Sequence, residues 1–278
     1  MKYDLLAIDL DGTLLDSQHR LVPANRAALH RAHEAGLRIV ICTGRSFTET
    51  RPVLADIGLD LDAAVSVFGA IITEVASGHT IDRTPIPLEV AHAATNWFQQ
   101  KGYPVLWLMD ADEIGFDGYL IDGPRRHPGV DRWLALSPCR VERVSVIPPD
   151  AAAPVRLSII DDEAVLPELS THLHAAFDGR LTHNLLHAPP YRLSLIEAFA
   201  PPVNKWYAVH KLCARWGLDP RRTVAIGDDV NDVQMIRNAG LGVAMGNAAP
   251  AVKAVAAELT ATNDEGGVAL VIDRLLNT

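Results

Sequence analysis

Short apolar runs alternate with helical patterns through the N-terminal part of the chain. Leu5–Ile8, Leu37–Cys42 and Ala63–Phe68 are apolar runs that end at turn-forming residues, as buried strands do. Between them, the segments Pro23–Gly36 and Ser46–Ile57 carry the spacing and the flanking residues of helices. This alternation predicts βαβ units, which build a parallel sheet.

The same alternation returns towards the C-terminus. A helical pattern over Val203–Trp216 is followed by an apolar run at Thr223–Ile226, another helix and an apolar run at Leu241–Met245. We therefore predict that residues 1–84 and 190–278 form one α/β domain, with a Rossmann-like parallel sheet.

The middle of the chain is less regular, and Pro85 and Pro87 mark where the pattern changes. Strand patterns and helix patterns alternate with long polar connections, and the stretch 110–149 reads as irregular. The predicted elements are helices over 88–101 and 165–177 and strands over 105–109, 155–160, 182–187 and 191–196. We predict an inserted α+β domain over 85–189.

Composition narrows the class of protein. The chain has 278 residues, 49% hydrophobic and 21% charged, which fits a soluble globular protein of about two domains and excludes disorder. The formal net charge of -9 disfavours nucleic acid as a partner. Three widely spaced cysteines, with no signal peptide and no membrane-spanning apolar run, favour a cytoplasmic protein. We expect a monomer or homodimer.

Carboxylates follow two of the predicted strands. Asp9 and Asp11 come after the first strand, and Asp228 and Asp232 come after the strand at Thr223–Ile226. Ligands of parallel sheets bind at the carboxyl ends of the strands, so these side chains are expected in one crevice. Clustered carboxylates repel one another unless a cation is present, and oxygen ligands suit Mg²⁺. The pattern predicts a magnesium site.

The Asp-x-Asp spacing has a mechanical interpretation. In an extended segment, residues two apart point the same way, so Asp9 and Asp11 would reach one substrate group, as nucleophile and as acid/base. Taken alone, this segment is more often a turn, Thr43 a helix cap and Lys205 a solvated lysine. Their occurrence together and in order favours catalysis.

The chain resembles the haloacid dehalogenase superfamily of phosphohydrolases, whose four motifs occur here in order. They are Asp9–Thr13, Thr43 within Ile41–Arg45, Lys205 ahead of a helix, and Gly227–Asp232. More narrowly, the chain is similar to the Cof-type branch, in which an α+β cap that sets substrate specificity is inserted between the second and third motifs. The resemblance covers the predicted α/β domain well and the cap only by size and position.

The resemblance implies a Mg²⁺-dependent phosphomonoesterase that acts on small phosphorylated metabolites such as sugar phosphates. Asp9 would attack phosphorus to form an aspartyl-phosphate, and Asp11 would serve as acid and then base. Asp9, Asp11 (through its carbonyl), Asp228 and Asp232 are the implied metal residues, although Asp232 would alternatively support Lys205.

The resemblance also implies a phosphate-binding set. Its members follow the strands or begin the third-motif helix, and they are Leu10, Thr43, Gly44, Lys205 and Asn231. Thr43 and Lys205 count among the catalytic residues as well.

Two features leave alternatives open. Relatives usually carry Asn-Gly-Ala after the third strand, where this chain has Phe68-Gly69-Ala70. A phosphomutase of the same superfamily and a non-catalytic phosphate-binding or regulatory protein are the rival functions. In the middle block, Arg125–His127 fits a surface loop better than an anion clamp.

Overall fold

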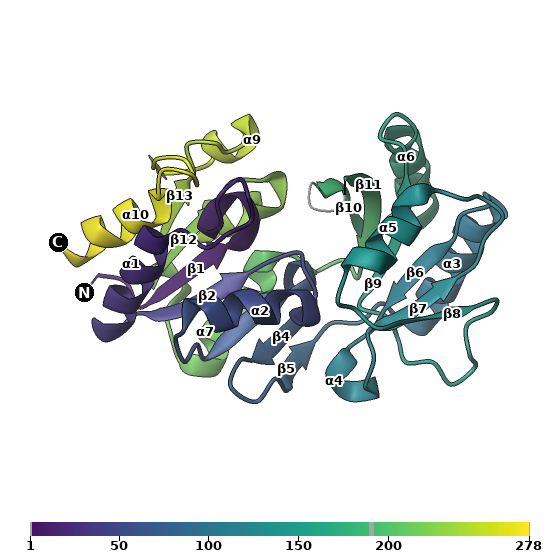
Figure 1. The fold of residues 1–278 in the computed structure, drawn as a ribbon, viewed down its shortest axis with the longest axis horizontal. Helices are drawn as coiled ribbons and strands as arrows, with labels where there is room; N and C mark the ends of the chain where they lie inside the picture. The colour runs from purple at the N-terminus through teal and green to yellow at the C-terminus, as the bar shows by residue number, and fades with distance from the viewer. Residues whose placement is uncertain (1, 189–191, 278) are drawn as a thin grey trace. The chain divides into compact units, whose positions relative to one another are not determined.

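A computed structural model describes residues 2–188 and 192–277, which form two compact units (Figure 1). The first unit comprises Met1–Ile81 and Asn204–Thr278, and the second comprises Asp82–Val203. No helix in the described ranges is long and apolar enough to cross a membrane.

The first unit is built on an eight-stranded sheet in the order β14-β13-β12-β1-β2-β3-β4-β5. Its strands are β1 (Leu5–Asp9), β2 (Arg38–Cys42), β3 (Ala63–Ser66), β4 (Ile71–Glu74), β5 (Thr80–Arg83), β12 (Thr223–Gly227), β13 (Leu241–Ala244) and β14 (Glu258–Leu259). Pairing is parallel from β14 to β3, and β4 runs antiparallel to β3. The predicted α/β class with a parallel sheet is confirmed, whereas β4 and β5 were not predicted.

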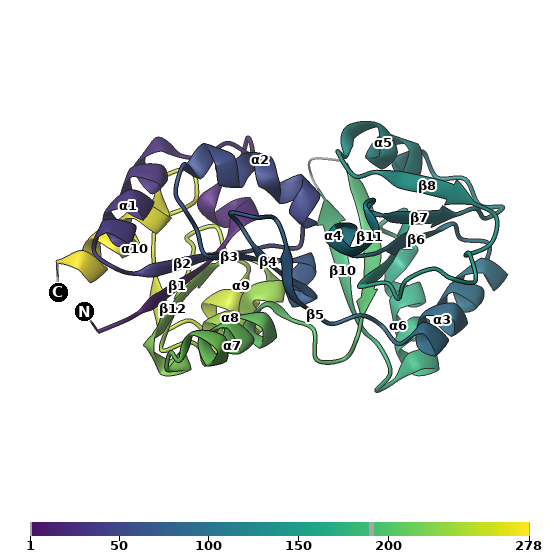
Figure 2. The ribbon, with the colours of Figure 1, turned by 90° about the horizontal axis from the view of Figure 1, so that it is seen from below.

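Helices cover both faces of this sheet (Figure 2). On one face lie α1 (Pro23–Glu34), α2 (Phe47–Ile57) and α10 (Gly267–Leu276), and on the other lie α7 (Lys205–Trp216) and α8 (Val233–Asn238). The short helix α9 (Pro250–Lys253) precedes β14. Because both faces are covered, the central strands consist mainly of apolar residues, and every residue of β1 is buried.

The second unit has a six-stranded sheet in the order β10-β11-β9-β6-β7-β8. Its elements are α3 (Leu88–Gln100), β6 (Val105–Leu108), α4 (Ala111–Ile114), β7 (Gly118–Ile121), α5 (Pro128–Leu136), β8 (Val141–Val144), β9 (Arg156–Asp161), α6 (Leu166–Phe177), β10 (Thr182–Ala188) and β11 (Leu193–Phe199). Apolar residues of α3 and α6 pack with one face of this sheet, and Val130 and Trp133 of α5 pack with the other.

The middle of the chain departs from the sequence prediction in two places. The stretch 110–149 is not irregular, since it contains α4, β7, α5 and β8. The two strands are four residues long and β8 has no buried residue, so no apolar run marks it. The predicted boundary at 189/190 and Tyr191 lie outside the described residues, and β11 belongs to the second unit because it pairs with β9 and β10.

Candidate active site

Three adjacent strands of the first unit end at the predicted motif residues. Asp9 is the last residue of β1, Thr43 follows β2, and Asp228 follows β12. In the sheet, β1 lies between β2 and β12 and runs parallel to both, with Asp9 opposite Cys42. The three side chains therefore leave the same edge of the sheet, as expected from the topology.

Lys205 joins two of the carboxylates. It is the first residue of α7, a helix capped by the Asn204 side chain, which accepts the Tyr207 N–H at 2.9 Å. Its Nζ lies 2.5 Å from Asp9 Oδ1 and 2.6 Å from Asp232 Oδ1. All three side chains are buried, so this is an ion-pair network shielded from water.

Asp232 holds the loop that follows β12. Its Oδ2 accepts the backbone N–H groups of Asp228 at 3.0 Å and of Asp229 at 3.2 Å, while its Oδ1 accepts from Lys205. Both oxygens are therefore engaged by protein donors. These bonds favour the supporting role for Asp232 over direct binding of a metal.

Residues of the first motif orient the Asp228 side chain. Thr13 Oγ1 donates to Asp228 Oδ1 at 2.9 Å, and Asn247 Nδ2 donates to the Gly12 carbonyl at 2.8 Å. Gly12 has a φ of +78°, and a Cβ atom there would lie 2.3 Å from Asp228 Oδ2. Glycine is required at this position both by the backbone conformation and by the close approach of Asp228.

Asp11 makes a separate set of contacts. Arg45 Nε donates to Asp11 Oδ2 at 2.8 Å, Arg45 Nη2 donates to Oδ1, and His19 Nδ1 lies 3.2 Å from Oδ1. The extended-strand argument for Asp9 and Asp11 is wrong in its detail, because β1 ends at Asp9 and the chain turns through Leu10–Leu14. What orients Asp11 is its partner arginine.

A second part of the site consists of Thr43, Gly44 and Phe68. Thr43 Oγ1 accepts the Arg45 N–H at 3.1 Å, and α2 is capped by Ser46 and not by Thr43. The Phe68 ring covers Gly44 so closely that a Cβ atom on Gly44 would lie 2.2 Å from its Cζ. Phe68 has a φ of +55°, a left-handed conformation that is strained for a bulky residue. Phe68 stands where relatives usually carry asparagine, and its aromatic ring packs directly against Gly44.

Leu10 and Asn231 are placed differently from each other. The Leu10 side chain belongs to the hydrophobic core, so only its backbone is available to a ligand. Asn231 Oδ1 is buried and has no hydrogen-bond partner among the described residues. An orphaned buried acceptor of this kind fits a site that a ligand or water completes.

The electrostatics of the cluster follow from burial. Burial and the Asp232 charge raise the pKa of Asp9 well above its usual range, against the opposite effect of Lys205. Burial alone would lower the pKa of Lys205, but Asp232 and Asp9 raise it above its ordinary value, so the ammonium stays protonated. Burial and Asp232 raise the pKa of Asp228 to about 6.

Asp11 has the opposite character. Its burial would raise the pKa, but hydrogen bonds from His19 and Arg45, together with the Arg45 charge, lower it to about 2. The pKa values of the two carboxylates of the first motif are thus shifted in opposite directions, upward for Asp9 and downward for Asp11.

Carboxylate oxygens of Asp9, Asp228 and Asp232 lie within 4.8 Å of one another. When all three are ionised, their negative charge exceeds the charge of the Lys205 ammonium, which is ion-paired with Asp9 and Asp232. A set of hard oxygen donors with uncompensated charge fits a divalent cation such as Mg²⁺.

Three contacting residues were not given these roles from the sequence. Arg45 stands in the second motif without an assigned contact, Asn247 follows β13, and His19 lies in the turn after the first motif. The Thr13 hydroxyl also binds Asp228, a contact between the first and the last motif. Only the pairing of distant segments reveals these contacts.

Residues 6–272 match the family described as haloacid dehalogenase-like hydrolase. Among similar proteins, the chain is 28% identical to the 5-amino-6-(5-phospho-D-ribitylamino)uracil phosphatase YcsE of Bacillus subtilis, over 96% of this chain and 94% of that protein. It is 26% identical to the pyridoxal phosphate phosphatase YbhA of Escherichia coli, over 96% and 97%.

Solved structures agree with these sequence matches. A haloacid dehalogenase-like hydrolase from Bacteroides thetaiotaomicron superposes with a TM-score of 0.82 at 27% identity, over 98% of this chain and 99% of that chain. The similarity therefore includes both units.

Proposed function

Since the chain belongs to the haloacid dehalogenase-like hydrolases and is a phosphomonoesterase of that family, we propose that it uses Mg²⁺ and a phosphoryl intermediate on Asp9 to hydrolyse small phosphorylated metabolites, such as sugar phosphates. The observation that carries the proposal is the buried contact of Asp9 with Lys205, beside Asp228. This contact holds the Asp9 carboxylate at the edge of the sheet, next to the Lys205 ammonium.

In the first step, an Asp9 carboxylate oxygen attacks phosphorus, and the bond from phosphorus to the leaving oxygen breaks. Asp11 gives a proton to that leaving oxygen. In the structure, Asp11 is held ionised by Arg45 and His19, so it must loosen these bonds to carry the proton. Lys205 holds Asp9 in place and offsets negative charge near the phosphoryl oxygens.

In the second step, Asp11 takes a proton from water, which attacks phosphorus and breaks the bond to Asp9. Inorganic phosphate leaves and the Asp9 carboxylate is restored. The ionised form that Arg45 stabilises is the form this step requires.

Asp9, Asp228 and the Asp11 carbonyl would hold the metal, with Asp232 fixing Lys205 and the loop after β12. When bound, Mg²⁺ supplies positive charge that neutralises the phosphoryl oxygens in the transition state. Thr43, Gly44, Asn231 and the Leu10 backbone would bind phosphate oxygens. The unpartnered Asn231 Oδ1 would accept a hydrogen bond from a donor on the substrate or from water, and its Nδ2 would be the group that donates to a phosphate oxygen.

The inserted unit, Asp82–Val203, would select the substrate, since the relatives named above act on chemically different phosphate esters. A cytoplasmic location is supported by three free cysteines, which fit a reducing compartment.

The test is phosphate release from a panel of phosphate esters with and without Mg²⁺, comparing the native chain, Asp9→Asn and the control Asp56→Asn on the exposed surface of α2. We expect Mg²⁺-dependent release that only Asp9→Asn abolishes. Transfer of phosphate to a second position without net release would identify a phosphomutase instead. Full activity of Asp9→Asn would refute the nucleophile.

A further inference from the structure

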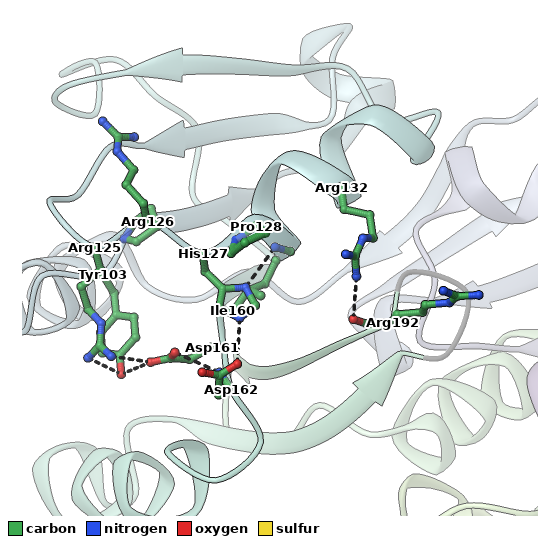
Figure 3. Close-up of a pocket in the computed structure, with 12 residues that line it drawn as sticks. Tyr103, Arg125, Arg126, His127, Pro128, Arg132, Ile160, Asp161, Asp162 and Arg192 are labelled. Carbon is green, nitrogen blue, oxygen red and sulfur yellow. Dashed lines mark hydrogen bonds and ion pairs between the residues drawn. The ribbon is translucent and has the colours of Figure 1, made fainter.

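A cavity in the second unit gathers charged side chains, but they do not converge on one point (Figure 3). At one end, Arg125 Nη2 lies 2.9 Å from Asp161 Oδ2. At the other end, Arg132 Nη1 donates to the Arg192 carbonyl at 3.1 Å, and Arg126 points out of the cavity. These guanidinium groups face different ways, so they do not form a common site for one anion.

The turn after β1, in the first unit, is held by side chains that do converge. Three of its carbonyl groups each accept a hydrogen bond from an asparagine amide. The donors are Asn247 Nδ2 to the Gly12 carbonyl at 2.8 Å, Asn25 Nδ2 to the Leu14 carbonyl at 3.0 Å and Asn263 Nδ2 to the Leu15 carbonyl at 2.9 Å. These asparagines lie on α1, after β13 and before α10, so distant parts of the chain fix the backbone of the turn.

Gly12 is the residue of the turn at which such a restraint matters most. Glycine has more backbone freedom than any other residue, and no side chain can replace it here, because its φ is +78° and a Cβ atom would lie 2.3 Å from Asp228 Oδ2. The carbonyl of Asp11, one of the proposed metal ligands, belongs to the peptide group directly before Gly12. Rotation of the Gly12 backbone would therefore move that carbonyl away from the metal position.

Asn247 faces two parts of the metal site. Its Nδ2 donates to the Gly12 carbonyl and lies 3.5 Å from Asp228 Oδ2, and one amide nitrogen carries a hydrogen for each of these acceptors. Asn247 Oδ1 accepts the Asn263 N–H at 3.0 Å, which turns the nitrogen of the amide towards the site. The Asn247 side chain is exposed, so it is not there to fill the core.

The exact placement of these oxygens matters more for Mg²⁺ than for Ca²⁺. Mg²⁺ requires a nearly ideal octahedral shell, whereas Ca²⁺ accepts irregular and flexible ones. If the turn fluctuates, the Asp11 carbonyl and the Asp228 carboxylate match the Mg²⁺ geometry for only part of the time, and the apparent affinity falls by that fraction. A restraint at Gly12 therefore favours Mg²⁺ over Ca²⁺.

We propose that Asn247, held by Asn263, is a positioning residue for the metal site, which restrains the turn at Gly12 and the Asp228 carboxylate in the geometry that Mg²⁺ requires. This role rests on the Mg²⁺ site of the proposed function. It adds that the selectivity of the site for Mg²⁺ over Ca²⁺ depends on a residue that does not itself bind the metal.

Calorimetry of Mg²⁺ and Ca²⁺ binding at pH 7.5 without substrate tests this role independently of turnover. Asn247→Leu keeps the size of the side chain and removes its donor, and Asn247→Ala removes the donor without adding an apolar surface. Both variants should bind Mg²⁺ about fivefold more weakly, an effect of the size expected for one lost hydrogen bond, and Ca²⁺ within about twofold of the native chain.

The matched control is Asn238→Leu. Asn238 is exposed at the end of α8, and its Nδ2 donates to the Gln234 carbonyl at 2.7 Å, so the substitution removes the same kind of bond outside the turn. This variant should keep the native affinity for both ions. Denaturant unfolding without metal should be alike for Asn238→Leu and Asn247→Leu, since each loses one exposed hydrogen bond.

Phosphate release gives the matching kinetic result. The Asn247 variants should need about fivefold more Mg²⁺ for half of the maximal rate, with kcat at saturating Mg²⁺ within about twofold of native, because the bound ion restores the turn. Unchanged Mg²⁺ affinity in both Asn247 variants, or an equal loss of Ca²⁺ affinity, would overturn the role of Asn247 and leave the phosphatase proposal standing. A native chain that binds no Mg²⁺ would overturn the metal site itself, and the role of Asn247 with it.

Discussion

The ammonium of Lys205 lies 2.5 Å from the carboxylate of Asp9, although 196 residues separate them in the chain. The contact joins the first strand of the sheet to the helix that follows the inserted unit. It also brings Asp232 within 2.6 Å of the same nitrogen. The first and last motifs are therefore tied together by one buried cation.

Removal of that cation should damage both stability and catalysis. Lys205→Met leaves Asp9 and Asp232 buried without their partner, and breaking such a pair costs about 3–5 kcal/mol of unfolding free energy. Denaturant unfolding at pH 7.5 measures this loss, and phosphate release should fall with it. Lys211→Met on the same helix, where the ammonium covers the Tyr207 ring, is the control. Equal stability of the two variants would contradict the network.

Magnesium affinity should depend on the protonation of Asp228. The pKa of Asp228 is raised to about 6, so at pH 4–6 the folded chain retains a proton that an unfolded aspartate has released. The metal-free protein is therefore destabilised by this group as the pH rises from 4 to 6, and Mg²⁺ reverses that effect above pH 6. Calorimetry should show affinity falling by at least about tenfold per pH unit below pH 6, since the pKa of Asp9, the other carboxylate ligand, is raised as well.

The matched variant for this measurement is Asp228→Asn, which should bind Mg²⁺ weakly at every pH. Asp229→Asn, next to it but outside the proposed ligand set, should keep the native pH dependence. Equal Mg²⁺ affinity of the native chain at pH 5 and pH 7.5 would sink the assignment of Asp228.

The two proposed roles of Asp11 can be separated with a substrate that needs no acid. The leaving group of p-nitrophenyl phosphate departs without protonation, so Asp11→Asn should still transfer phosphate to Asp9. Water attack then lacks its base and should slow by about 10²–10⁴-fold. Rapid mixing should show a burst of about one nitrophenolate per chain before slow turnover. Steady release without a burst would remove Asp11 from the second step.

Phe68 is expected to influence substrate binding more than turnover. Phe68→Asn removes the ring from Gly44 and places in the left-handed conformation a residue that tolerates it better. We expect kcat to stay within about threefold, because the ring has no group for proton or phosphoryl transfer and its centre lies 6.0 Å from Lys205 Nζ, while KM for polar esters falls. Phe68→Leu keeps an apolar side chain and should retain the native KM. A large loss of kcat in Phe68→Asn alone would show that the ring positions Lys205 or Thr43.

The sequence predicted the sheet and its motif residues because parallel topology brings the strand ends together. Asp9, Thr43 and Asp228 follow apolar runs that could be recognised locally, and their adjacency needed only strand order. The contacts of Arg45 and His19 with Asp11 depend on a turn after β1, which an extended-strand spacing does not describe.

Weakly patterned elements could not be predicted for a similar reason. The strand β8 has no buried residue, and it joins the sheet by pairing with β7. The arginines of the second unit are separated by up to 67 positions, from Arg125 to Arg192, so their shared cavity is visible only in the fold.

The central claim is the covalent role of Asp9, and it is tested most directly by trapping the phosphoryl group. Asp11→Asn is mixed with p-nitrophenyl phosphate labelled with radioactive phosphorus, quenched in acid, treated with borohydride and mapped by mass spectrometry. The account predicts phosphate bound to the protein before treatment and homoserine in place of Asp9 afterwards. Turnover with no bound phosphate, or reduction at another carboxylate, would contradict it.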